Sequence, residues 1–146
     1  MTGQMLAVAV LGLVVSASAW GQEPEKESEK VEFSKAYGDC LDKSDGITLR
    51  MRECNGEELR RQDGQLNSLY RELSAKSTPE ARAALVRTQR AWIAFRDAEC
   101  EYEGEQHSGG TLEAIVIGGC HVEMTAQRVM QLRRYVRIEH GFREEP

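Results

Sequence analysis

Hydrophobic residues recur along most of this chain at intervals of three and four, the spacing that places side chains on one face of an α-helix. The first such stretch is short, and the Ser-Asp-Gly turn at residues 44–46 ends it. The pattern therefore predicts a short N-terminal helix with an apolar face. The residues of that face are Phe33, Ala36, Tyr37, Cys40 and Leu41.

A second helical pattern covers about residues 48–75. Asn55-Gly56 and Gly64 interrupt it, and glycine is a poor helix former. A break near residues 54–57 is therefore an alternative to one continuous helix. The apolar positions of this pattern are Met51, Cys54, Leu59, Leu66, Leu69, Tyr70 and Leu73.

A third helix is predicted from residue 79 to about residue 101. Thr78 suits the N-cap and Pro79 the first helical position, while Glu80 suits the positive end of the helix dipole. The inner face is expected to carry Leu85, Thr88, Trp92, Phe95 and Cys100, with Arg96 beside them.

A polar loop at residues 103–110 precedes the last helical pattern, which begins at Thr111 and fades near Ile138. Gly118-Gly119 within it would either kink the helix or allow close contact with a neighbour. No convincing strand pattern is present. The fold class is therefore all-α, a small disulfide-linked helical bundle of three main helices plus a short N-terminal helix.

The ends of the chain have a different composition. Residues 5–15 are an apolar run, and Ala-x-Ala-type small residues precede a cleavage site after Ala19, which predicts a signal peptide at residues 1–19. This run is too short to span a bilayer, and an uncleaved interfacial anchor is the alternative. We expect a charged flexible linker at residues 20–32, the helical domain at 33–140 and a tail at 141–146.

Four cysteines behind a signal peptide indicate two disulfides and a periplasmic or secreted location. Three pairings are possible. Cys40–Cys54 and Cys100–Cys120 are favoured, because each closes a short loop that contains a glycine turn. A mixed Cys/His metal site that uses His107 or His121 is the alternative.

The acidic net charge of −5 argues against a nucleic-acid partner and permits a cationic protein partner. No catalytic constellation, cofactor motif or metal motif is present, so we do not expect an enzyme. The carboxylate pairs Glu99/Glu101 and Glu103/Glu105 are typical of a solvated helix end.

Two arginines lie near the apolar faces of the last two helices, where a guanidinium needs polar partners. We expect Arg96 and Arg128 to form an internal polar network that Gln89 and Thr125 complete. A ligand site built on the arginines is the alternative.

Three blocks of residues resemble the LprI-like lysozyme-inhibitor domain, a family of small exported bacterial proteins. The first is Cys40, Met51-x-x-Cys54 and Asp63-x-x-Leu66-Asn67-x-x-Tyr70-x-x-Leu73. The second is Leu85-x-x-x-Gln89-x-x-Trp92-x-x-x-Arg96-Asp97-x-x-Cys100. The third is Gly109-Gly110-Thr111 with Cys120-x-x-x-x-Thr125-x-x-Arg128-x-x-x-Leu132. The resemblance covers residues 37–132 and implies a helical periplasmic or secreted domain with paired cysteines.

The resemblance also implies a protein partner, namely a cationic lysozyme. In that case the acidic segment 101–110 is the candidate partner-binding loop. We expect His107 or Ser108 nearest the catalytic centre, and Glu103 and Glu105 against its basic rim. An interaction or structural role with a non-lysozyme partner in the periplasm is the alternative.

Overall fold

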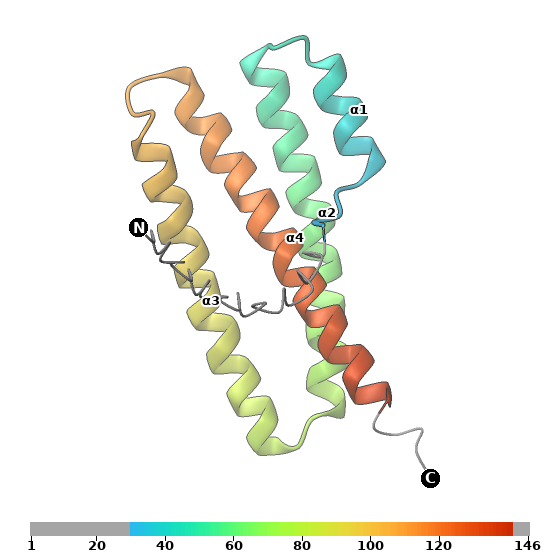
Figure 1. Cartoon of the computed structure of the whole chain (residues 1–146). Helices are drawn as coiled ribbons and strands as arrows, with labels where there is room; N and C mark the ends of the chain where they lie inside the picture. The colour runs from blue at the N-terminus through green and yellow to red at the C-terminus, as the bar shows by residue number, and fades with distance from the viewer. Residues whose placement is uncertain (1–29, 142–146) are drawn as a thin grey trace, which may run out of the picture.

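The computed structural model describes residues 30–141, and in that part of the chain every regular element is a helix (Figure 1). The predicted all-α bundle of three long helices and one short helix is confirmed. The predicted signal peptide at 1–19 lies outside the described residues, as do most of the linker and residues 142–146. The helices are α1 (Lys35–Lys43), α2 (Thr48–Lys76), α3 (Pro79–Glu105) and α4 (Thr111–Gly141).

Helix α4 is the centre of the bundle. It packs along both α2 and α3, whereas α2 and α3 make few contacts with each other (Figure 1). Its inner positions are almost completely buried, and Leu66 and Leu73 of α2 pack against them. Helix α3 is therefore attached to the molecule mainly through α4. The buried positions of α4 are Cys120, Val122, Thr125, Ala126, Arg128, Val129 and Leu132.

Helix α2 is continuous, so the alternative of a break near residues 54–57 is wrong. The Asn55 side chain is buried and bonds to two other helices. Its oxygen accepts a hydrogen bond from the Tyr37 hydroxyl of α1 (2.7 Å), and its nitrogen donates one to the Ile115 carbonyl of α4 (3.1 Å). A Cβ atom at Gly118 would lie 2.9 Å from Asn55 Nδ2. Gly118 thus permits the close contact between α2 and α4, and α4 continues through it.

Helix α3 extends to Glu105, about one turn beyond the predicted end near residue 101. Gly104 is buried in its last turn, where an added Cβ would lie 2.5 Å from Ile117 Cγ1 of α4. The glycine therefore allows close packing of the two helices and does not end the helix.

The predicted inner face of α3 was wrong at two positions. Thr88 is exposed and Phe95 is 57% exposed, whereas Gln89 is buried. The inward-facing positions are Leu85, Gln89, Trp92, Arg96 and Cys100, with Gly104 one turn further on. Polar side chains take part in this face because they have partners on α4.

Both favoured disulfides are present. Cys40–Cys54 joins α1 to α2, and Cys100–Cys120 joins α3 to α4, with Cα–Cα distances of 5.7 and 5.5 Å. Closing loops of this length contributes about 3 kcal/mol each in the chain-entropy account. The structure leaves no free cysteine in residues 30–141 for the alternative metal site.

A buried carboxylate anchors the N-terminal segment to α2. Glu58 is fully buried and accepts hydrogen bonds from the Ser34 amide (3.0 Å), the Ser34 hydroxyl (2.5 Å), Arg61 Nε (2.9 Å) and Gln62 Nε2 (2.7 Å). Ser34 also caps α1 by accepting from the Tyr37 amide. Helix α1 therefore starts after Ser34, and Phe33, which was predicted on its apolar face, is exposed.

The folded surroundings of Glu58 favour its charged form. Burial raises the pKa of the carboxyl, but the hydrogen bonds from Ser34, Arg61 and Gln62 together outweigh burial, so the pKa lies below its usual value of 4.5. A pKa that is lower in the folded than in the unfolded chain contributes stability above the unfolded value. That contribution is lost as the pH falls through the folded pKa.

We therefore expect Glu58→Gln to lower the free energy of unfolding by about 2–3 kcal/mol at neutral pH, because donors are left without a charged acceptor. The loss should shrink as the pH falls from 4.5, where the unfolded chain begins to take up a proton at Glu58, through the lower pKa of the folded carboxyl. Urea denaturation of wild type and variant from neutral to acid pH measures both the loss of stability and its decrease. The control is Glu57→Gln, a neighbour that is 52% exposed and 3.9 Å from Arg61, and it should change stability by less than about 0.5 kcal/mol. Equal effects of the two substitutions would contradict this account of the anchor.

Candidate functional site

The predicted binding loop is the end of a helical hairpin, and we call residues 101–113 the α3–α4 tip (Figure 1). Glu103 and Glu105 lie in the last turns of α3, which corrects the prediction of a loop from residue 103 onward. Only residues 106–110 form the connection. The side chains of Glu103, Glu105, His107 and Ser108 are all exposed, at the same end of the bundle.

The connection itself is held by short-range hydrogen bonds. The His107 amide donates to the Gly104 carbonyl (2.8 Å), and the Ser108 amide donates to the Glu105 carbonyl (3.2 Å). Gly109 has a φ of +80°, a conformation that favours glycine, and its amide donates to the Glu113 carboxylate (3.3 Å). These bonds place His107 and Ser108 at the apex of the tip.

The α3–α4 tip carries the negative charge of the protein. Residues 101–113 contain four acidic residues and no lysine or arginine, so the tip has a formal charge of −4 with neutral histidines. The whole chain has −5, so residues outside the tip sum to about −1. A cationic partner would therefore be attracted to this end of the molecule. The four residues are Glu101, Glu103, Glu105 and Glu113.

An exposed aromatic side chain lies among these acids. Tyr102 is 64% exposed and is flanked in sequence by Glu101 and Glu103. Exposed tyrosines are frequent anchors of protein interfaces. The sequence analysis did not select Tyr102, although an aromatic residue between acids on a polar helix end was the available signal.

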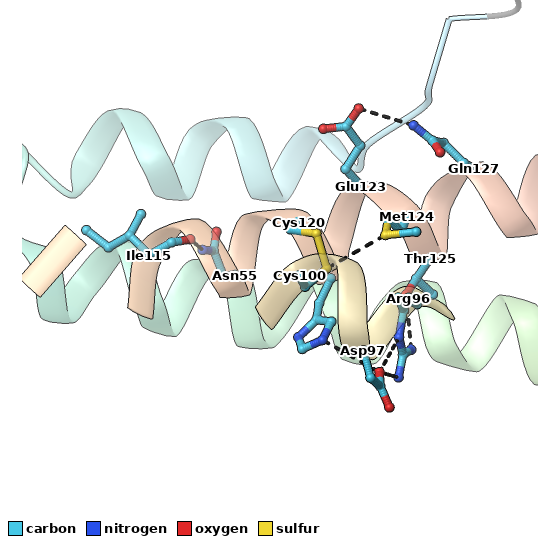
Figure 2. The surroundings of a disulfide bond; sticks show 11 residues. Asn55, Arg96, Asp97, Cys100, Ile115, Cys120, Glu123, Met124, Thr125 and Gln127 are labelled. Carbon is cyan, nitrogen blue, oxygen red and sulfur yellow. Dashed lines mark hydrogen bonds and ion pairs between the residues drawn. A yellow bond between two sulfur atoms is a disulfide. The ribbon is translucent and has the colours of Figure 1, made fainter. Parts of the chain in front are cut away.

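The base of the tip is braced by the Cys100–Cys120 disulfide and by an ion pair beside it (Figure 2). Arg96 donates to Asp97 Oδ1 from Nε (2.9 Å) and Nη2 (2.7 Å), and its Nη1 reaches the Thr125 hydroxyl (3.4 Å). The helices therefore enter the tip from a cross-linked base.

His121 lies next to this ion pair, with its Nε2 3.7 Å from Asp97. Burial and the nearby Arg96 charge lower the pKa of His121 below 6.5, and Asp97 and Asp63 only partly oppose this. The imidazole is therefore neutral at pH 7. It does not offset the negative charge of the tip.

The predicted polar network is divided into two groups around Trp92. Arg128 donates to Gln89 Oε1 from Nε (3.2 Å) and Nη2 (3.1 Å), whereas Arg96 contacts Thr125. Both guanidinium groups lie over the Trp92 ring, at 5.2 Å for Arg96 and 5.7 Å for Arg128. The structure thus places all four predicted residues at the α3–α4 interface, and the shared indole links the two groups.

Residues 30–141 contain no group of three His, Cys, Asp or Glu side chains that could hold a metal ion. None of the helices in this range is long and apolar enough to cross a membrane. The fully buried carboxylate of Glu58 is saturated by its four hydrogen bonds, which makes it a structural group.

Comparison with known proteins gives one family and one relative. The family model described as "Lysozyme inhibitor LprI" matches residues 40–132, well over half of the chain. A protein of Rhizobium meliloti (strain 1021) that carries the name "Uncharacterized protein R02472" is 29% identical over 134 residues, which is 83% of this chain and 86% of the relative. No solved structure matches. The matched segment contains both disulfides, the Trp92 network and the whole α3–α4 tip, and the chain belongs to the LprI lysozyme-inhibitor family.

Proposed function

We propose that this protein is an exported binding protein that inhibits a cationic lysozyme by inserting the α3–α4 tip into its substrate cleft. The observation that carries the proposal is the concentration of negative charge, −4 within residues 101–113, at the exposed end of one hairpin. Membership of the LprI family supports the class of partner. Opposite charge would steer the encounter, while contacts in the cleft would supply most of the affinity.

The order of side chains along the tip suits a cleft that contains two catalytic carboxylates. Glutamates placed against those carboxylates would be repelled. The apex residues His107 and Ser108 can donate hydrogen bonds instead, so we place them nearest the catalytic centre. Glu103 and Glu105, within about one turn of the apex on α3, would then contact the basic rim. Tyr102 is suited to anchor the same contact, because it is aromatic and exposed.

The tip is also built to keep its shape. Cys100–Cys120 closes its base, and Gly104 lets α3 and α4 approach closely within it. A loop that is ordered before binding loses less conformational entropy when it enters a cleft. This rigidity supports cleft occlusion by a preformed hairpin end.

The proposal also includes export of the protein from the cytoplasm. The apolar run at 5–15 and the small residues before Ala19 suit a signal peptide, and disulfides form in an oxidising compartment. We therefore place the mature protein in the periplasm or in the secreted fraction. N-terminal sequencing of the exported protein should begin at Trp20. An N-terminus at Met1 in a membrane-bound fraction would support an uncleaved anchor instead.

The function is tested by a lytic assay with a panel of lysozymes. The wild-type chain should inhibit at least one cationic lysozyme, and Glu103→Gln/Glu105→Gln should raise the inhibition constant on the order of tenfold, because two charges facing the basic rim are lost. Raising the salt concentration should weaken inhibition by the wild-type chain more than inhibition by this variant. The matched control is Glu80→Gln/Glu139→Gln, which removes two charges at the opposite end of the bundle and should leave inhibition unchanged.

Two results would count against the proposal. Absence of inhibition across several lysozyme types at micromolar protein would exclude it. If the tip variant and the control lose inhibition equally, the effect comes from net charge and not from the tip. Recovery of a single non-lysozyme protein from envelope extract, together with absent inhibition, would favour the alternative of another periplasmic partner.

A further inference from the structure

A groove lies at the end of the bundle opposite the α3–α4 tip. It has a volume of about 280 Å³ and runs between the end of α2, the first half of α3 and the second half of α4. Its apolar walls are Leu73, Ala81, Ala84 and Leu85. Few contacts join α2 to α3, so these helices leave this hollow beside α4.

A guanidinium without a counter-ion borders this groove. Arg128 is only 4% exposed, and its hydrogen-bond partners are the neutral amides of Gln89 and Gln131. No carboxylate of the described residues forms an ion pair with it, unlike Arg96, which has Asp97. Burial lowers the pKa of Arg128 below its usual value, and the nearby Tyr135 only partly opposes this. A buried charge of this kind is costly unless an anion pairs with it.

A hydroxyl donor belongs to the same network. Gln131 accepts a hydrogen bond from Arg128 and donates one to the Tyr135 oxygen (2.9 Å). Because the Tyr135 oxygen accepts that bond, its own proton remains to be donated. Tyr135 and Thr88 both line the groove, so hydroxyl groups accompany the guanidinium there.

We propose that this groove binds a small amphiphilic carboxylate, whose head pairs with Arg128 and whose apolar chain lies along Leu73, Ala84 and Leu85. A guanidinium forms paired hydrogen bonds with a carboxylate, and the apolar walls match an unbranched chain. Glu139 lines the groove eleven residues beyond Arg128, about 16 Å along α4. Its charge disfavours the reversed orientation, in which the ligand carboxylate would lie beside it.

The test uses the fluorescence of Trp92, whose ring lies 5.7 Å from the Arg128 guanidinium. The chain has two tryptophans, so Trp20→Phe leaves Trp92 as the single indole. Sodium decanoate, decanol and decyltrimethylammonium are titrated into this protein below their micelle concentrations. Decanoate should change the emission saturably and bind at least tenfold more tightly than the other two probes. Absence of a saturable change with decanoate, or equal binding of all three probes, would overturn the proposal.

Two substitutions test whether decanoate binds in this groove. Arg128→Gln removes the charge, and Ala84→Phe fills the groove while leaving the guanidinium in place. Each should weaken decanoate binding at least tenfold. The matched control is Ala94→Phe, at an exposed position of α3 that does not line the groove, and it should bind decanoate as the parent does. If Arg128→Gln does not fold, Ala84→Phe decides, because decanoate affinity equal to the parent in that variant would contradict the proposal. Lysozyme plays no part in this experiment, so its outcome is independent of the inhibition assay.

Discussion

The burial of α4 against both α2 and α3 holds the domain together, because the two outer helices make few contacts with each other. Val122, Val129 and Leu132 of α4 are almost completely buried, and the core forms around them. Helix α3 is positioned mainly by α4, and Cys100–Cys120 fixes one end of that contact. The same arrangement has two consequences for the surface. It projects a cross-linked hairpin end at one pole of the bundle and leaves a groove beside α4 at the other.

Polar side chains determine how the helices are aligned at these contacts. Asn55 links α2 to both α1 and α4, Glu58 ties the start of α1 to α2, and Arg128 pairs with Gln89 between α3 and α4. Each of these groups is buried, so a slip of one helix would leave a polar atom without its partner. Apolar contacts tolerate such slips more readily. We interpret these side chains as the elements that fix one alignment of an otherwise repetitive helical pattern.

The sequence predicted the helices and both disulfides, because periodic apolar positions, the Thr78-Pro79 start and glycine turns are local signals. It failed where a distant partner decides the outcome. Thr88 was assigned to the inner face of α3, although the residue buried there is Gln89, which was expected only as a member of the network with Arg128. Asn55-Gly56 does not break α2 because Asn55 is held by Tyr37 and by the Ile115 carbonyl. For the candidate site, the acidic segment was visible in the sequence, but the exposure of Tyr102 and the missing counter-ion of Arg128 required the packed helices.

The central claim is that the α3–α4 tip is the surface that meets the partner. Hydrogen–deuterium exchange of the protein alone and in complex with an inhibited lysozyme tests it directly. The account predicts slower exchange on binding for amides of residues 101–111, with no change for residues 79–90 at the other end of α3. A stable complex that leaves residues 101–111 unprotected would contradict it.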